Sequence, residues 1–180
     1  MRPAEILIAF ATPYLLAWMA MLVVQRQSVV SPAVAPQVAA ENALGRLAPA
    51  QRRGLLLYSV PELLFCVSAV IIAIAWQPAG LNGAVLRWGL AGMALVRFSL
   101  SWPMWQDLAS GKVAAIAGPL RKIQFQQRRA LATEDGPIMV LPVDRTLFAA
   151  HEAGQQATIY YVPHSKRVVA VLPANSPAEV

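Results

Sequence analysis

The sequence is poor in cysteine and histidine, and each shortage excludes a kind of site. Of its 180 residues, one is cysteine (Cys66) and two are histidine. A single thiol excludes an intrachain disulfide and any metal site that needs several cysteines. The long apolar runs contain no histidine, which argues against a haem held by this chain through an axial imidazole. We therefore expect neither a cofactor nor a metal.

Charged residues are also few, and their distribution indicates a membrane protein. They make up 13% of the chain, and hydrophobic residues make up 57%, against about 25% and 45–50% in average soluble domains. Residues 1–105 hold seven Lys or Arg and three Asp or Glu, whereas the shorter segment 106–180 holds eight and six. The net charge of +6 suits contact with anionic lipid, so nucleic acid is not an expected partner.

Three apolar runs are long enough to cross a membrane, at residues 6–24, 55–76 and 83–105. About twenty apolar residues span a hydrocarbon core of roughly 30 Å. The alternative for the first run is a cleaved signal peptide, but its 19 uncharged residues exceed the apolar region of about 7–15 residues typical of such peptides. The sequence therefore predicts a transmembrane domain over residues 1–105.

Positive charge near the ends of these runs predicts their orientation. The loop at residues 25–54 holds four arginines, and basic residues follow the third run, whereas the turn between the second and third runs holds no Lys or Arg. Under the positive-inside rule the N-terminus lies outside, and the loop and the C-terminal domain are cytoplasmic. We predict a multi-pass protein of a bacterial-type inner (plasma) membrane. The loop is either a short helix on the membrane surface or an ordinary connector.

Two charged residues inside the second and third runs are expected to pair. The short turn makes these runs an antiparallel hairpin, and Glu62 and Arg97 both lie roughly 10–12 Å from its cytoplasmic end. A lone charge at such depth costs about 2.5–3.5 kcal/mol. We predict a structural intramembrane ion pair between Glu62 and Arg97. Pairing with another subunit, or a role for Glu62 in a proton or ion pathway, remains open.

From residue 111 the pattern changes to short strands. The candidates are residues 112–118, 120–127, 137–151 with a bend at Pro142, 157–163 and 167–173, with turns expected at 131–136, 152–156 and 164–166. Four or five short strands predict a small all-β domain over residues 111–174, an SH3-like or OB-like barrel. A tail follows at 175–180. The predicted fold class is an α+β membrane protein with three transmembrane helices.

No catalytic motif is present, so we expect no enzyme and no small-molecule substrate. The only candidate groups in the C-terminal domain are His151, His164, Asp135, Asp144 and Glu152, without a Gly-rich phosphate loop or a nucleophile elbow. Basic residues are instead expected to face lipid headgroups or acidic protein surfaces. They are Arg52, Arg53, Arg121, Lys122, Arg128, Arg129, Lys166 and Arg167.

The order of apolar runs followed by a short β-rich segment resembles the layout of NfeD-like membrane proteins, whose soluble part is an OB-fold. Small residues in the third run are expected to allow close helix packing; they are Gly83, Gly89, Ala91, Gly92 and Ala94. We predict a non-enzymatic accessory or scaffolding subunit that binds membrane lipids and larger membrane subunits. The alternative is a membrane-tethered binding module for a peptide, a lipid headgroup or nucleic acid.

Overall fold

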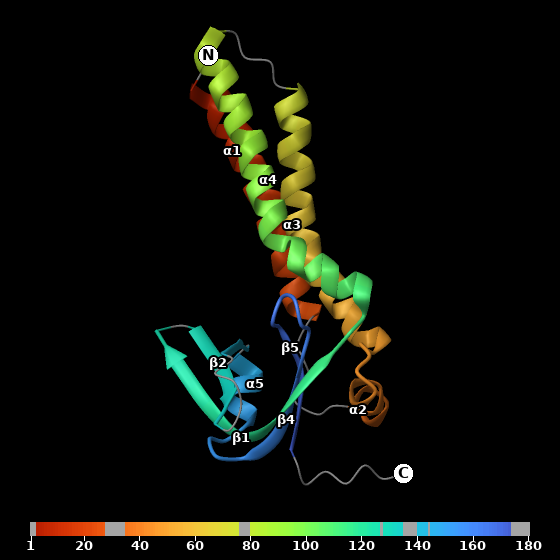
Figure 1. The fold of residues 1–180 in the computed structure, drawn as a ribbon. Helices are drawn as coiled ribbons and strands as arrows, with labels where there is room; N and C mark the ends of the chain where they lie inside the picture. The colour runs from red at the N-terminus through yellow and green to blue at the C-terminus, as the bar shows by residue number, and fades with distance from the viewer. Residues whose placement is uncertain are drawn as a thin grey trace. The chain divides into compact units, whose positions relative to one another are not determined.

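The computed structural model describes residues 3–27, 35–75, 80–126, 128–134, 140–143 and 145–173. The predicted tail and the candidates Asp135 and Asp144 lie outside these ranges. These residues form the helices and strands α1 (Pro3–Gln27), α2 (Pro36–Ala43), α3 (Pro49–Ala75), α4 (Gly80–Ser110), β1 (Ala114–Phe125), β2 (Arg128–Thr133), β3 (Leu141–Pro142), α5 (Arg145–Ala150), β4 (Gln156–Tyr161) and β5 (Val168–Pro173). Figure 1 shows the fold.

The chain divides into two compact units. The helical unit comprises residues 1–28 and 55–105, and the sheet unit comprises residues 29–54 and 106–180. The segment 29–54, which the sequence assigned to the transmembrane domain as a loop, thus groups with the sheet. Both α3 and α4 contribute residues to both units.

The helical unit confirms three long apolar helices, each long and apolar enough to cross a membrane. All three extend beyond the predicted runs: α1 covers Pro3–Gln27, α3 begins at Pro49 and α4 continues to Ser110. Proline is well suited to the first position of a helix, where its missing N–H has no intrahelical partner. Pro49 is thus a favourable first residue for α3.

Small side chains bring α3 and α4 together. Ala69 and Ala73 of α3 form a buried cluster with Leu90 and Ala94 of α4. Tyr14 joins α1 to this pair of helices, because its hydroxyl donates to the sulfur of Met93 over 2.9 Å and its ring meets Phe65 edge-on at 4.9 Å between centroids. The close approach of α3 and α4 follows from alanine at the contact positions.

The predicted small-residue face of the third run divides between two sides of α4. Gly83 and Ala94 are buried, whereas Gly89 and Gly92 are exposed. A Cβ atom added at Gly89 or Gly92 would meet nothing within 4 Å. The reason is helical phase, since residues three apart lie on one face and residues five or six apart do not.

In the sheet unit five antiparallel strands form one sheet in the order β3-β2-β1-β4-β5. The central strand β1 is shared: its first half, 114–119, pairs with β4 and its second half, 120–125, pairs with β2. Gly118, with φ of +153° and Thr133 directly beside it, lies where the partner changes. The core includes Leu120, Leu131 and Ile159, all fully buried.

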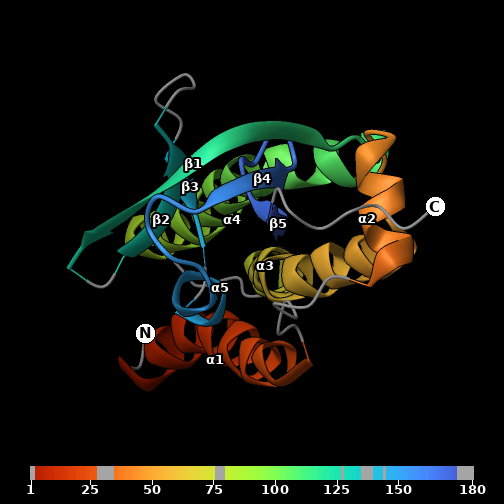
Figure 2. The same cartoon turned by 90° about the horizontal axis from the view of Figure 1, so that it is seen from below.

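The sheet is open, so the described strands do not form the predicted barrel. Segment 137–151 was predicted as a strand, but its described residues form the two-residue β3 and then α5. Leu147 of α5 is buried in the sheet core, and α5 lies beside β2 in Figure 2. Since α5 uses the residues of a long closing strand, β3 remains a short edge. Residues 131–133, predicted as part of a turn, belong to β2 instead.

A glycine substitution tests the junction between α4 and β1. Gly111 has φ of +61° and open space at its Cβ position, so Gly111→Ala should cost about 1–2 kcal/mol from backbone strain alone. Gly54→Ala is the matched control. Gly54 is inside α3, has open space and no positive φ, and alanine there should stabilise by about 0.5–1 kcal/mol. Denaturant unfolding measures both; effects of the same sign would contradict this account.

Candidate functional site

Glu62 of α3 and Arg97 of α4 come together in the helical unit. Nη1 of Arg97 lies 3.5 Å from Oε1 of Glu62, and the two side chains keep 40% and 33% of their surface exposed. The guanidinium also lies 5.2 Å from the ring centroid of Phe65. The second carboxylate oxygen, Oε2, is buried and accepts no hydrogen bond. The charges are therefore adjacent but incompletely satisfied, and their effect on stability stays a prediction.

Other polar groups of the helical unit bond within it. Nε of Arg87 donates to the carbonyl of Ala73 over 2.6 Å. The hydroxyls of Ser59 and Ser101 donate to carbonyls of their own helices, at Leu56 and Phe98. A serine hydroxyl that bonds to a carbonyl of its own helix needs no further polar partner. In the part of the chain that the structure describes, these serines form no relay to Glu62.

The basic residues predicted to face lipid or a partner differ in their exposure. Arg52, Arg53, Arg121 and Lys166 are exposed, and Arg129 and Arg167 are half-buried. Arg128 belongs to β2.

Lys122 has partners inside the sheet unit. Its Nζ donates to the carbonyl of His151 over 2.8 Å and lies 4.3 Å from the ring centroid of Phe148. Lys166, although exposed, has its Nζ 5.6 Å from the ring centroid of Tyr161. Because a cation over an aromatic face is attracted to it, Lys122 joins β1 to α5 and to the residue that follows it.

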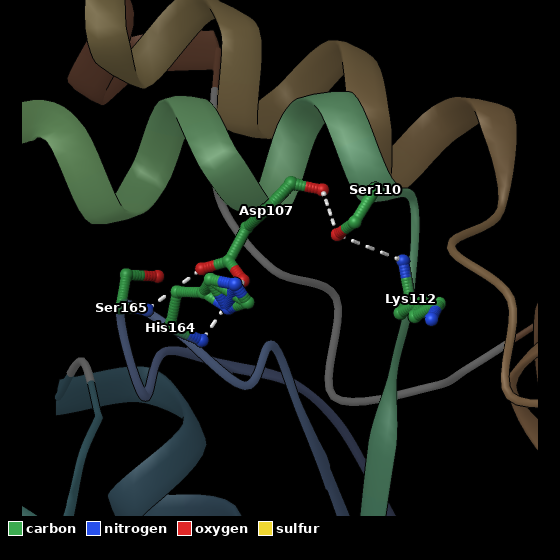
Figure 3. Close-up of polar contacts among 5 residues, drawn as sticks. All are labelled: Asp107, Ser110, Lys112, His164 and Ser165. Atoms are coloured by element: carbon green, nitrogen blue, oxygen red, sulfur yellow. Dashed lines mark hydrogen bonds and ion pairs between the residues drawn. The ribbon is translucent and has the colours of Figure 1, made fainter.

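The most developed polar site was not singled out by the sequence: it is the carboxylate of Asp107 near the end of α4 (Figure 3). Asp107 is fully buried. Its Oδ1 accepts the backbone N–H of His164 over 2.9 Å, and its Oδ2 accepts that of Ser165 over 2.7 Å. Nδ1 of His164 lies 3.6 Å from Oδ1. Two adjacent N–H groups on one carboxylate fix the turn between β4 and β5 to α4. We call this arrangement the Asp107 clamp.

One sequence signal points to Asp107. An acidic side chain in the last turn of a helix faces the negative end of the helix dipole, so it is unfavourable unless donors compensate it. Asp107 lies three residues before Ser110, where α4 ends. It is also the one acidic residue between Glu62 and Glu134. An acid at so unfavourable a position indicates a specific set of donors.

Asp107, His164 and Ser165 are the residue types of a catalytic triad, but their geometry differs from one. In a triad the carboxylate orients the histidine, which in turn activates the serine hydroxyl. Here the carboxylate binds main-chain N–H groups, and the buried Oγ of Ser165 has no hydrogen-bond partner. Among the described residues, no group of three or more His, Cys, Asp or Glu is placed to hold a metal. The clamp therefore positions a turn.

The fold and these sites define a class of protein with three long apolar helices and a small antiparallel sheet. Comparison of the chain with protein-family models, with curated proteins and with solved structures finds no match.

Proposed function

We propose that the chain is a three-span membrane protein that acts as an accessory or scaffolding subunit of a larger membrane complex. In this proposal it lies in a bacterial-type inner membrane with its N-terminus outside, and its sheet unit is a cytoplasmic interaction surface. The supporting observation is the partly exposed pair of Glu62 and Arg97 on helices whose other exposed side chains are largely apolar.

An ion pair that remains partly exposed is costly in lipid. Charged groups inside membranes face protein or water-filled cavities rather than hydrocarbon. In the described part of the helical unit, α1, α3 and α4 leave more than a third of the Arg97 side chain uncovered. A neighbouring subunit that covers this pair would remove the cost. This reasoning favours a subunit of a complex over a protein that is alone in the bilayer.

The exposed glycines of α4 offer a place where the helix of a neighbouring subunit can approach closely. Gly89 and Gly92 lie three residues apart and have open space at their Cβ positions. Small residues on a membrane helix let a second backbone approach closely. Large exposed side chains flank them, among them Val85 and Trp88. This surface, which we call the Gly89–Gly92 surface, suits a transmembrane helix of a larger subunit.

The proposal is tested by mild-detergent extraction, native-size separation and mass spectrometry of the proteins that travel with the chain. The expected result is a defined set of larger membrane subunits at fixed ratio. Gly92→Leu should release them, because the new side chain occupies the space of the partner helix without meeting its own protein.

Ala75→Leu is the control for this experiment. Ala75 is exposed at the end of α3, so the added bulk is similar and lies away from Gly92, and this variant should keep its partners. A wild-type chain that migrates alone would overturn the accessory role and favour a membrane-tethered binding module. Orientation is tested with a reporter enzyme, fused after residue 180, that functions only outside the cytoplasm. Activity of this reporter would overturn the predicted cytoplasmic location of the sheet unit.

A further inference from the structure

Two exposed cations in the sheet unit are held directly opposite each other by the backbone. Arg46 and Lys112 form an isolated antiparallel bridge. The N–H of Leu47 donates to the carbonyl of Gly111 over 2.8 Å, and the N–H of Val113 donates to that of Gly45 over 2.9 Å. These bonds flank the pair rather than join it. In such a non-hydrogen-bonded pair the two Cα atoms are only about 4.5 Å apart and the side chains are at their closest.

The local sequence makes this placement specific. Each cation follows a glycine with positive φ, since φ is +71° at Gly45 and +61° at Gly111. Each precedes a buried apolar residue, Leu47 or Val113. Because successive side chains on paired extended segments point to opposite sides, burial of these two apolar residues turns both cations outward. Both Arg46 and Lys112 are exposed.

No acidic side chain neutralises the pair within the described residues, where the ion pairs involve neither Arg46 nor Lys112. Glu41 and Asp107 are the nearest acids along the chain, each five residues from one of the two cations. The backbone carbonyl of Glu41 accepts the Arg46 N–H over 3.0 Å, and the Asp107 carboxylate already accepts the two backbone N–H groups of the Asp107 clamp. Like charges directly opposite each other destabilise a strand pair. A fold that holds two cations side by side without an internal anion is suited to an anion from outside.

The position of the pair indicates which anion. Lys112 comes two residues after the end of α4, and Arg46 comes three residues before the start of α3. Figure 3 shows Lys112 just beyond the end of α4. Both helices are long and apolar enough to cross a membrane. Residues just beyond such helices lie at the depth of lipid headgroups, where each Lys or Arg gains about 1 kcal/mol from anionic lipid. A phosphate can bridge two cations through its separate oxygens.

We propose that Arg46 and Lys112 form a binding site for the phosphate of an anionic phospholipid headgroup. This inference rests on the membrane location in the proposed function, but it needs no partner subunit. It differs from the simpler role of two cations that complement the negative C-terminal ends of α2 and α4. In that role, loss of the cations would destabilise the protein in every lipid.

The test compares full-length protein in neutral and anionic lipid. Purified wild type, Arg46→Gln/Lys112→Gln and the control Arg121→Gln/Arg145→Gln are placed in phosphatidylcholine or in phosphatidylglycerol vesicles. The control removes the same charge from two other exposed positions. The midpoint of thermal unfolding is measured for each. In phosphatidylcholine the Arg46/Lys112 variant should unfold at a higher temperature than wild type, because the repulsion is gone. In phosphatidylglycerol the order should reverse.

Affinity gives a second readout. Phosphatidylglycerol titrated into detergent-solubilised protein should bind about 25-fold more weakly to the Arg46/Lys112 variant, or about fivefold for each cation removed. An equal loss in the control would overturn the site in favour of general surface charge. A variant less stable than wild type in both lipids would overturn it in favour of the helix-end role. The unfolding midpoints are also measured in phosphatidylcholine with inorganic phosphate added. A reversed order of wild type and variant there would support a phosphate site and overturn the lipid headgroup as its ligand.

Failure of the proposed function is scored separately. Carbonate washing of the vesicles reports whether the chain is embedded, and co-purification reports whether it has partner subunits. A chain that is embedded and binds phosphatidylglycerol through Arg46 and Lys112, but travels alone, keeps the lipid site and loses the accessory role. An embedded chain whose variants all respond alike to phosphatidylglycerol loses the lipid site alone.

Discussion

Asp107→Ala is expected to lower the free energy of unfolding of the sheet unit by about 3–5 kcal/mol. The substitution removes both acceptor oxygens of the Asp107 clamp and leaves the N–H groups of His164 and Ser165 without their partner. An unsatisfied buried donor costs about 1–3 kcal/mol, and hydrogen bonds to a charged group are stronger than neutral ones. Because Asp107 is fully buried, water cannot easily replace the lost acceptors.

The loss should also appear as faster proteolysis at one place. Lys166 and Arg167, which follow the clamped residues, are trypsin sites in the turn before β5. With the turn released, trypsin should cleave there well before it cleaves wild type. Asp107→Asn keeps one acceptor oxygen but places its NH₂ group against the other N–H donor. Its free energy of unfolding should therefore lie between those of wild type and Asp107→Ala. Denaturant titration in detergent and limited proteolysis measure these effects.

Glu134→Ala is the control for the clamp. Glu134 is an exposed acid of the sheet unit, and surface substitutions away from special contacts usually change stability by less than about 0.5 kcal/mol. Its removal matches the charge change of Asp107→Ala without touching the clamp. Equal stability and equal cleavage of the two variants would show that the clamp does not hold the turn.

The second large effect is expected at Glu62 and Arg97. Either Glu62→Leu or Arg97→Leu should destabilise the helical unit by about 2.5–3.5 kcal/mol, because each leaves the opposite charge unpaired among apolar side chains. The double substitution should restore most of the loss, since apolar replacement of a buried ion pair is often close to neutral. Unfolding titrations of the four proteins give the coupling energy between the two positions.

The pair of Glu62 and Arg87 supplies the control cycle. Arg87 also lies in α4, but it bonds to the carbonyl of Ala73 rather than to Glu62. Distant sites without shared partners add within about 0.3–0.5 kcal/mol. Coupling should therefore be large for Glu62 with Arg97 and near zero for Glu62 with Arg87. Additive effects in both cycles would show that the ion pair does not contribute to the stability of the hairpin.

Local sequence was sufficient for the helices and for the hairpin of β4 and β5. Long uncharged runs define the three apolar helices, and the hairpin strands are rich in β-branched and aromatic residues. The ends of the helices were less predictable, because Pro49 reads equally as a breaker and as a first helical residue. The juxtaposition of Glu62 and Arg97 was predicted because a short turn sets the register of two antiparallel helices.

The missed features depend on contacts between distant parts of the chain. Segment 137–151 is apolar enough for a strand. Its part around Leu147 is helical instead, and Leu147 packs in the core of the sheet, a contact that local sequence does not specify. Asp107 meets a turn 57 positions further along. The bridge of Arg46 with Lys112 joins two loops, and no periodic pattern in the sequence indicates that these two residues pair. Short-range patterns cannot specify such pairings.

The central position of β1 has a consequence for folding during synthesis. β1 is the first strand made, and it can pair at once with β2 through a local hairpin. Its other edge stays unpaired until β4 has been synthesised, and β4 lies some 30 residues beyond the end of β1. At about 5–20 residues per second, the ribosome adds the 57 residues between Asp107 and its turn in roughly 3–11 s. Over that interval the nascent sheet has one completed side and one side exposed to chaperones and proteases.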